Sequence, residues 1–328
     1  MKKVMVTGAG GFIGSHLVEK LLSRGYDVYA FDNRLLNDCL NLKEMIDHKN
    51  LHFFKGDIRN IEDIQNFFQD DAEVIYHLAS TVGVRYYMRD PLSLIDITIN
   101  GTKNIIELCI QKNIKLIFAS TSEVYGKNSN VPWKEESDRV LGDPSVDRWC
   151  YSSSKALIEH MLFALYRANK LNFATVRFFN VYGPKQNPIF VVSQSVYRVL
   201  NNIPPDIYDG GEQIRCFTYI DDAIDGIIQV GELSKANGKA FNIGNQVPTK
   251  IKDIVNLCIK ESKKNIEINN INTNDLYGDV YQDIINRIPN CEKAYEVLGW
   301  KAEIQVNIGI RKTIMWAKEN PWYLQQVI

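Results

Sequence analysis

Three glycines close to the N-terminus have the spacing of a loop that binds a diphosphate. Gly8, Gly11 and Gly14 form G-x-x-G-x-x-G directly after the apolar run at residues 3–7. Positions without a side chain let the backbone approach phosphate oxygens, and the N–H groups at the start of a following helix attract them. No G-K-[ST] follows, which disfavours a nucleotide-hydrolysing loop. The pattern therefore predicts a dinucleotide-binding turn.

An acidic residue at the end of the second apolar run fits the ribose of such a dinucleotide. Asp32 lies 18 residues after Gly14, where a carboxylate accepts hydrogen bonds from both ribose hydroxyls and repels a 2′-phosphate. We therefore expect NAD, with NADP as an alternative because the cationic Arg34 is close. Asp57 follows the third run and is expected to reach the adenine. The other residues predicted to bind the cofactor are Phe12, Ile13, Asn33, Ile58, Leu78 and Ala79.

A tyrosine and a lysine stand four residues apart in the segment YSSSK. Tyr151 and Lys155 would share one face of a helix at this spacing. An ammonium beside a phenol, helped by a nicotinamide cation, favours the phenolate, so Tyr151 is predicted to be a base near neutral pH. Lys155 is also expected to hold the hydroxyls of the nicotinamide ribose. Hydroxyls and a carboxylate that follow the fifth apolar run are predicted to lie beside them: Thr121, Ser122 and Glu123.

Strands and helices that alternate along the first half of the chain must position these residues. Apolar runs predict strands at 3–7, 27–31, 51–54, 74–78, 115–119 and 172–177. Apolar residues at helical spacing predict helices at 12–23, 92–111 and 152–169. Strands with helices between them indicate right-handed βαβ crossovers and a parallel sheet. The predicted fold class is therefore α/β, a doubly wound sheet of the Rossmann type.

After residue 180 this rhythm loosens, and turns marked by glycine and proline become frequent. Two short elements of sheet and helix are still predicted before residue 245. We therefore expect a Rossmann domain at 1–184 together with about 215–248. A smaller, mixed α/β lobe at about 185–214 and 249–328 is expected to bind the substrate.

Composition excludes several other classes of protein. The 328 residues carry 38 Lys and Arg against 39 Asp and Glu, so no global positive field is available for a nucleic acid or an acidic membrane. The six cysteines lie far apart without a C-x-x-C pair, which predicts neither a zinc site nor a disulfide framework. No run of 18 apolar residues and no signal-peptide pattern is found. We therefore expect a cytoplasmic protein without a metal.

Segments in order along nearly the whole chain resemble one superfamily. They are TGAGGFIGSH (7–16), GDIRN (56–60), HLAS (77–80), STSEVYG (120–126), YSSSK (151–155), RFFNVYGP (177–184), QIRCFTYIDD (213–222), FNIGN (241–245) and LGW (298–300). The chain resembles the extended short-chain dehydrogenases/reductases, namely the NAD-dependent epimerases, dehydratases and decarboxylases of nucleotide sugars. The resemblance implies a bound NAD⁺ that takes a hydride from C4 of a sugar linked to a nucleoside diphosphate.

The pair Ser122-Glu123 resembles UDP-glucuronate decarboxylases, including the decarboxylase domain of the bifunctional polymyxin-resistance protein. That domain also has Arg-Trp before its tyrosine, as at Arg148, and a D-G-G-x-Q-x-R-C-F-T run like that from Asp209. It has Y-Q-D and R-x-P as well, which implies that Arg287 acts with Ser122 and Glu123 in decarboxylation. UDP-xylose or a UDP-4-keto-pentose is then the expected product.

Three other functions remain as alternatives. A 4,6- or 5,6-dehydratase would use Glu123 to remove the C5 proton, whereas a 4-epimerase would need no carboxylate there. A non-catalytic NAD-binding sensor would bind the cofactor without turnover. Arg215 and Arg287 are predicted to bind the diphosphate through planar guanidinium forks. The other predicted substrate-binding residues are Arg85, Tyr87, Asn180 and Tyr281.

The predicted helices at about 92–111 and 152–169 carry apolar residues over more than one face. A helix that is apolar on two sides packs against a second partner. The resemblance implies a homodimer in which these two helices form a four-helix bundle with their copies.

Overall fold

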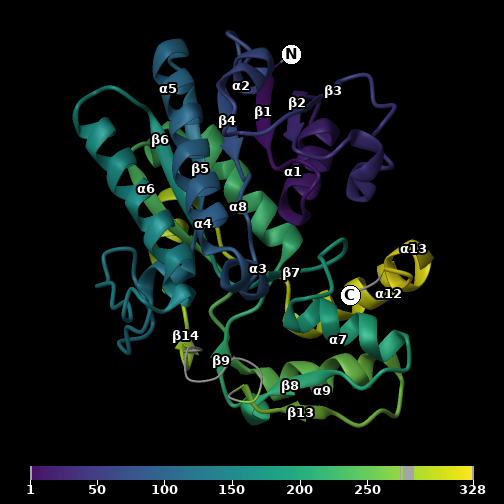
Figure 1. Ribbon diagram of the computed structural model, residues 1–328. Helices are drawn as coiled ribbons and strands as arrows, with labels where there is room; N and C mark the ends of the chain where they lie inside the picture. The colour runs from purple at the N-terminus through teal and green to yellow at the C-terminus, as the bar shows by residue number, and fades with distance from the viewer. Residues whose placement is uncertain (1, 274, 276–283, 327–328) are drawn as a thin grey trace.

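Seven parallel strands form the central sheet of this computed structural model (Figure 1). The structure describes residues 2–273, 275 and 284–326, without the side chains of residues 84, 85 and 87. The strands of the sheet are β1 (Lys3–Thr7), β2 (Asp27–Asp32), β3 (Leu51–Lys55), β4 (Val74–His77), β5 (Lys115–Thr121), β6 (Phe173–Phe178) and β11 (Lys239–Ile243). Their order is β11-β6-β5-β4-β1-β2-β3. The strand order turns back at β1 and β4, which is where doubly wound sheets bind ligands.

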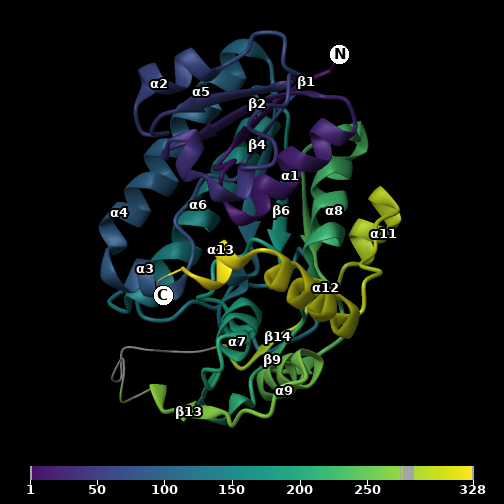
Figure 2. The ribbon, with the colours of Figure 1, turned by 90° about the vertical axis from the view of Figure 1, so that its right-hand side faces the viewer.

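Helices cover both faces of the sheet because successive strand side chains point to opposite sides. Val4 and Val6 belong to the apolar cluster that includes residues of α1 and α8, whereas Met5 belongs to the cluster with residues of α5 and α6. Figure 2 shows these two layers of helices on either side of the strands. The covering helices are α1 (Phe12–Ser23), α2 (Ile61–Phe67), α5 (Thr102–Lys112), α6 (Cys150–Arg167) and α8 (Ile220–Glu232). The predicted doubly wound α/β fold is confirmed.

The helix predicted at 92–111 is one continuous rod with a wide turn in its middle. It consists of α4 (Pro91–Asp96), the π-helical turn η3 (Ile97–Gly101) and α5. A Cβ atom on Gly101 would lie 2.5 Å from Cδ1 of Ile58, so glycine permits the rod to pack against that side chain. The remaining short helices of this region are η1 (Leu36–Asp38), η2 (Leu40–Leu42), α3 (Val84–Arg89), η4 (Ser122–Tyr125), η5 (Asp147–Trp149) and η7 (Ser234–Ala236).

Smaller sheets and helices lie beyond the carboxyl ends of the central strands (Figure 1). The strands are β7 (Val181–Tyr182), β8 (Asp206–Tyr208), β9 (Ile214–Arg215), β10 (Thr218–Tyr219), β12 (Thr249–Lys250), β13 (Asn269–Ile271) and β14 (Asn286–Arg287). The helices are α7 (Val191–Leu200), η6 (Asp209–Gly211), α9 (Ile251–Ser262), α12 (Val306–Glu319) and α13 (Pro321–Leu324), whereas α11 (Glu292–Leu298) packs beside the edge strand β11 and η7. One apolar cluster joins this region to the sheet, since it contains both Val6 and Ile310. The two-domain boundaries stay a prediction. Within the described part of the chain, no helix is long and apolar enough to cross a membrane.

Candidate active site

A cavity of about 1010 Å³ opens where the carboxyl ends of the strands meet the smaller sheets. It collects nearly all residues that the sequence singled out. Those in its wall are Gly8, Gly11, Phe12, Ile13, Gly14, Asp32, Asn33, Asp57, Ile58, Leu78, Ala79, Thr121, Ser122, Glu123, Tyr151, Lys155, Asn180, Arg215 and Arg287. The side chains of Arg85 and Tyr87, on α3, and all of Tyr281 lie outside the described part of the structure.

The glycine turn at one end of this cavity has no room for side chains. A Cβ atom on Gly14 would lie 2.1 Å from the carbonyl oxygen of Gly8, and one on Gly8 would lie 2.8 Å from the backbone nitrogen of Ala79. Gly8 also has a φ of +69°, which disfavours any other residue. Helix α1 begins directly after Gly11, whose position provides no side-chain cap for its first N–H groups. This arrangement fits the diphosphate of a dinucleotide.

Asp32 lies buried at the end of β2, close to the glycine turn. Its Oδ2 accepts a hydrogen bond from the backbone N–H of Gly10 at 2.9 Å, and its Oδ1 accepts one from Nε of Arg34 at 2.9 Å. Arg34 is therefore an ion-pair partner of the carboxylate that the sequence analysis assigns to the ribose. Nη2 of Arg34 donates to Oδ2 of Asp32 as well, at 3.2 Å, so the guanidinium engages both oxygens.

Asp57 caps the turn after β3 while it lines the cavity. Its Oδ1 accepts hydrogen bonds from the backbone N–H of Arg59 at 2.9 Å and from Nε of Arg59 at 3.0 Å. These bonds to Arg59 hold the pKa of the Asp57 carboxyl below its usual range. The neighbouring Ile58 packs against Gly101, as described above. The loop therefore presents an ionised carboxylate and an apolar side chain to the cavity.

Tyr151 and Lys155 lie in the first turns of α6, and both are buried. Burial lowers the pKa of Lys155 to about 7, although the charge of Glu159 partly opposes this effect. Nζ of Lys155 donates to the carbonyl oxygen of Ala119 at 2.8 Å and lies 5.9 Å from the centre of the Tyr151 ring. The helix therefore brings the predicted pair together on one face, next to the end of β5.

The pKa of Tyr151 differs from the sequence-based expectation. Burial and the charge of Glu123 raise the pKa of the phenol above its usual range, whereas a hydrogen bond with Thr121 and the charge of Arg287 oppose this rise. Desolvation outweighs the cations because a phenolate buried in an apolar setting is costly. The phenol is therefore protonated in the protein alone, and the prediction that its pKa is lowered does not hold there.

Glu123 is held between two guanidiniums, which come from distant parts of the chain. Nη2 of Arg148 donates to Oε1 at 3.1 Å and Nη1 of Arg148 lies 2.8 Å from Oε2, while Nη2 of Arg287 donates to Oε1 at 2.7 Å. Burial alone would raise the pKa of the Glu123 carboxyl, but the charges of Arg148 and Arg287 outweigh it and lower the pKa to about 2. Glu123 is therefore an anion throughout the physiological range.

Arg287 keeps donors that this ion pair does not use. Among the described residues its Nε is buried and has no hydrogen-bond partner, and its Nη1 is 3.5 Å from Oγ of Ser122. Arg215 is its direct neighbour, because β14 pairs in parallel with β9 and places Arg287 opposite Arg215. Nη1 of Arg215 donates to the carbonyl oxygens of Ile214 and Ile285. Two guanidiniums thus enter the cavity side by side from one small sheet.

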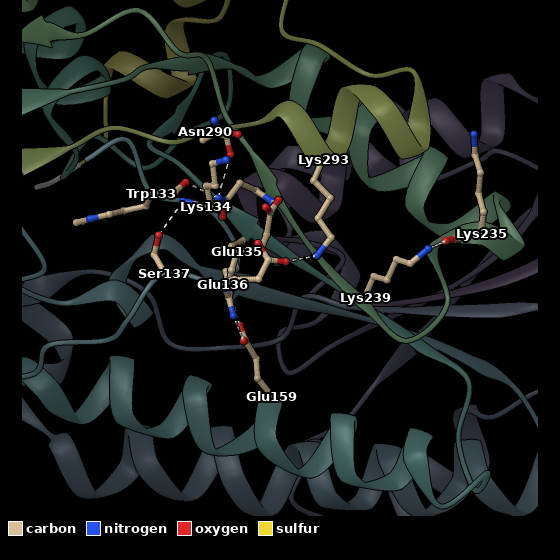
Figure 3. A network of polar contacts seen from close by, with 12 residues as sticks. Trp133, Lys134, Glu135, Glu136, Ser137, Glu159, Lys235, Lys239, Asn290 and Lys293 are labelled. Atoms are coloured by element: carbon tan, nitrogen blue, oxygen red, sulfur yellow. Dashed lines mark hydrogen bonds and ion pairs between the residues drawn. The ribbon is translucent and has the colours of Figure 1, made fainter. Parts of the chain in front are cut away.

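A buried polar network anchors the segment that carries Arg287 (Figure 3). The backbone of Trp133 donates to the carbonyl oxygen of Ile288 at 2.8 Å and accepts from the N–H of Asn290 at 2.7 Å. Nδ2 of Asn242, on β11, donates to the carbonyl oxygens of Trp133 and Asn290 at 2.9 and 3.1 Å. This network links β14 to the central sheet and fixes where Arg287 enters the cavity.

The same network continues beneath α6. Oδ1 of Asn242 accepts from the hydroxyl of Tyr125 at 2.7 Å, and Nη1 of Arg177 donates to that hydroxyl at 2.8 Å. Arg177 also binds both carboxylate oxygens of Glu159, which is one turn beyond Lys155 on α6 and is labelled in Figure 3. Ser120 donates to Glu159 as well, at 2.5 Å. The strand ends and α6 are therefore held in register by buried, fully paired charges.

Replacing Asn242 with alanine should destabilise the protein and disturb the position of Arg287. The variant removes the acceptor of the buried Tyr125 hydroxyl and the side-chain donor to the Asn290 carbonyl, while the Trp133 carbonyl keeps its bond from the N–H of Asn290. Each buried group that loses its hydrogen bond costs about 1–3 kcal/mol. We expect a lower midpoint of thermal unfolding and reduced turnover. Asn172→Ala, at an exposed position before β6, is the matched control and should change neither. An unchanged melting temperature in Asn242→Ala would contradict the anchoring role.

Some functional contacts were not assigned from the sequence. In the sequence Arg148 is part of a resemblance only, and the pattern assigns no role to Asn242 or Glu159. The available signal for Arg148 is its place three residues before Tyr151, which brings both side chains to one face of a helix start. No local signal connects Asn242 to residue 290, because that contact depends on how distant segments pack.

Comparison with known proteins identifies relatives that cover the full length of this fold. The profile of the family described as GDP-mannose 4,6 dehydratase matches residues 5–313. UDP-N-acetyl-alpha-D-glucosaminuronate decarboxylase from Bacillus cytotoxicus is 32% identical over 321 residues, which are 97% of this chain and 98% of that protein. Bifunctional polymyxin resistance protein ArnA from Wigglesworthia glossinidia brevipalpis is 32% identical over 98% of this chain, which matches 52% of that longer protein.

Solved structures agree with these matches. UDP-glucuronic acid 4-epimerase from Bacillus cereus, in complex with UDP-glucuronic acid and NAD, is 28% identical with a TM-score of 0.85, and the match covers 97% of this chain and 99% of that one. The cofactor in that complex agrees with the glycine turn and Asp32 described above, and NAD is the cofactor of this group of enzymes. The chain therefore belongs to the GDP-mannose 4,6-dehydratase family and is an NAD-dependent, nucleotide-sugar-modifying enzyme of the extended short-chain dehydrogenase/reductase superfamily.

Proposed function

We propose that this enzyme decarboxylates a UDP-linked hexuronate by way of a 4-keto sugar. The observation that carries the proposal is Glu123 held between Arg148 and Arg287. Arg287 keeps a buried Nε without a partner among the described residues, and a guanidinium in this state is suited to a second carboxylate. A uronate carries its carboxylate at C6, whereas the sugar of a 4,6-dehydratase substrate carries a neutral hydroxyl there.

The electrostatics of Glu123 disfavour the dehydratase alternative. A dehydratase would need this residue to remove the proton from C5, and a useful base has a pKa near the working pH. The two guanidiniums lower the pKa of Glu123 to about 2 in spite of its burial, so the carboxylate binds a proton only weakly. The epimerase alternative gives no role to a buried, doubly paired carboxylate. In our proposal Glu123 orients Arg287 and moves no proton.

The first chemical step uses the groups at the start of α6. The glycine turn, Asp32 and Lys155 would hold NAD⁺, which would supply the hydride acceptor for C4 of the sugar and a cation that favours the phenolate of Tyr151. Tyr151 removes the proton of the C4 hydroxyl, and Thr121, which is hydrogen-bonded to Tyr151, orients that hydroxyl. Lys155 lies at the end of β5 and supplies positive charge to the same corner of the cavity.

Loss of CO₂ follows from the position of the new ketone. The C4 carbonyl is β to the C6 carboxylate, so the electron pair of the C5–C6 bond passes into an enolate on C4 oxygen as CO₂ leaves. In this proposal the hydroxyls of Thr121 and Ser122 donate hydrogen bonds to that oxygen, and water supplies the proton that is added at C5. A UDP-4-keto-pentose is then complete, whereas UDP-xylose also requires that the hydride return to C4. Arg287 holds the carboxylate until the bond breaks. Arg215, beside Arg287 on the neighbouring strand, binds the diphosphate in this proposal.

The relatives support the same choice of substrate class. The proteins from Bacillus cytotoxicus and Wigglesworthia glossinidia brevipalpis, each 32% identical, are a UDP-N-acetyl-glucosaminuronate decarboxylase and an ArnA protein. We therefore propose UDP-glucuronate or its 2-acetamido counterpart as the substrate, and UDP-xylose, the corresponding 2-acetamido pentose or a UDP-4-keto-pentose as the product.

The proposal is tested by proton NMR of the purified protein with NAD⁺ and each of the two UDP-uronates in turn. We expect the H5 signal of the hexuronate to be replaced by the signals of a pentose or a 4-keto pentose. A hexuronate that keeps C6 and is inverted at C4 would make the enzyme an epimerase. Unchanged uronates together with dehydration of neutral UDP- or GDP-hexoses would make it a dehydratase.

We further propose that the enzyme is a homodimer formed through α4, α5 and α6. Leu92 and Leu157 are 78% and 47% exposed on the outer side of these helices, and α4 packs directly on α6. Exposed apolar side chains on neighbouring helices favour a helical partner. Sedimentation should give twice the chain mass of 37.6 kDa. Leu157→Glu should reduce this mass by half, whereas Met315→Glu, at a 60% exposed position on α12, should leave it unchanged.

A further inference from the structure

Arg148 makes the more complete contact of the two guanidiniums that hold Glu123. One of its terminal nitrogens donates to Oε1, and the other lies 2.8 Å from Oε2 as an ion-pair contact without hydrogen-bond geometry, whereas Arg287 engages Oε1 through one nitrogen. Arg148 is also more deeply buried, with 2% of its surface exposed against 8% for Arg287. A two-pronged guanidinium contact fixes the orientation of a carboxylate. The carboxylate plane of Glu123 is therefore set from the side of α6.

This division of contacts leaves Arg287 available. Its Nη1 makes only a 3.5 Å contact with Ser122, and its Nε has no partner among the described residues. If Arg148 were absent, Glu123 would be left with Arg287 as its guanidinium partner, and the favoured geometry of that pair is two parallel hydrogen bonds. Arg287 would then use a second N–H group to bind Glu123, and fewer of its N–H groups would be left to bind a ligand.

We propose that Arg148 is a positioning residue for substrate selection: by holding Glu123 it keeps donors of Arg287 directed at the C6 carboxylate of the sugar. This inference rests on the proposed uronate decarboxylation and deepens it. Arg148 occupies η5, three residues before Tyr151, so the same helix start positions the base and, through Glu123, the carboxylate-binding group. The inference predicts that replacing Arg148 weakens the binding of acidic sugars far more than the binding of neutral sugars.

The test compares two ligands that differ only at C6, UDP-glucuronate and UDP-glucose. Their dissociation constants are measured by calorimetry with NADH in place of NAD⁺, so that neither sugar is oxidised during the titration, for the wild type, Arg148→Met and Arg148→Lys. We expect the wild type to prefer the uronate by about tenfold or more, since a charge-assisted hydrogen bond is at stake. In Arg148→Met this preference should fall to within about twofold, mainly through weaker uronate binding. Arg148→Lys keeps the charge but not the fork, so it should give an intermediate preference.

A purely structural role would give a different pattern. Both ligands would then bind more weakly by the same factor, and their ratio would stay at the wild-type value, which would overturn the inference. Arg139→Met, at an exposed arginine, is the matched control and should keep the wild-type ratio. If Arg148→Met does not fold, the ratio in Arg148→Lys decides, and a wild-type value there overturns the inference.

Failure of the underlying function is recognised separately. A wild type that releases no CO₂ from any UDP-uronate would overturn the proposed decarboxylation itself. A wild type that decarboxylates, combined with an Arg148→Met variant of unchanged uronate preference, would leave the decarboxylation standing and refute only the role of Arg148.

Discussion

Tyr151→Phe is expected to lower kcat by about 10²- to 10⁴-fold, the range typical for removal of a general base. The substitution removes one oxygen from a buried ring and leaves Lys155 and the glycine turn in place, so NAD binding should persist. The loss arises because no other group in the cavity is proposed to take the proton of the C4 hydroxyl. Turnover is measured by substrate consumption, and NAD affinity by titration of the cofactor.

A matched substitution separates catalysis from packing. Tyr166→Phe removes a hydroxyl from the same helix, at a position that is 37% exposed and outside the cavity. It should keep wild-type turnover. If Tyr151→Phe retained more than about a tenth of the wild-type kcat while remaining folded, its role as the base would be refuted.

Glu123→Gln is expected to reduce CO₂ release by about 10²-fold, because Arg287 loses the carboxylate that orients it and a misplaced substrate-positioning group costs a factor of this size. The glutamine has nearly the same shape, but it leaves the buried guanidiniums of Arg148 and Arg287 without their shared anion. Breaking a buried ion pair in this way also destabilises a protein, by about 3–5 kcal/mol. Bicarbonate formation and thermal unfolding measure the two effects independently. Glu136→Gln, at an exposed pair with Lys293, is the control and should change neither.

The stability effect of Glu123 has a defined dependence on pH. The pKa of this carboxyl is about 2 in the folded protein, below its ordinary value of 4.5, so its contribution is complete above pH 4.5 and is lost as the pH falls to 2. Between these limits the wild type should lose more stability than Glu123→Gln. Parallel acid-unfolding curves for the two proteins would show that the ion pairs are not formed in solution.

The sequence predicted, for a physical reason, that the residues assigned to the cofactor would lie close together. The glycine turn, Asp32 and the Tyr151–Lys155 pair depend on spacing within single elements, and local periodicity determines which side of an element each residue occupies. All of them line one cavity in the structure. The helix at 12–23 was predicted with its observed bounds, since apolar spacing and the preceding glycines mark its start.

The contacts at the substrate end of the cavity could not be predicted as fully from the sequence. The contacts of Glu123 with Arg148 and Arg287 depend on the pairing of β14 with β9. These strands are too short to show a recognisable alternation of apolar and polar residues in the sequence. Sequence reasoning also predicted that the ammonium of Lys155, together with a bound nicotinamide cation, favours the phenolate of Tyr151, whereas the pKa of Tyr151 is raised in the protein without the cofactor. The opposite direction results from burial, which a sequence does not give for an individual side chain.

The fate of C6 tests the central claim most directly. UDP-glucuronate labelled with ¹³C at C6 is incubated with the enzyme and NAD⁺ and followed by carbon NMR, with the Tyr151→Phe protein as the inactive control. We expect one labelled bicarbonate for each hexuronate consumed, with no label left in the sugar product. Consumption of the substrate with the label retained in the sugar would contradict decarboxylation and leave the two arginines around Glu123 without the function proposed for them.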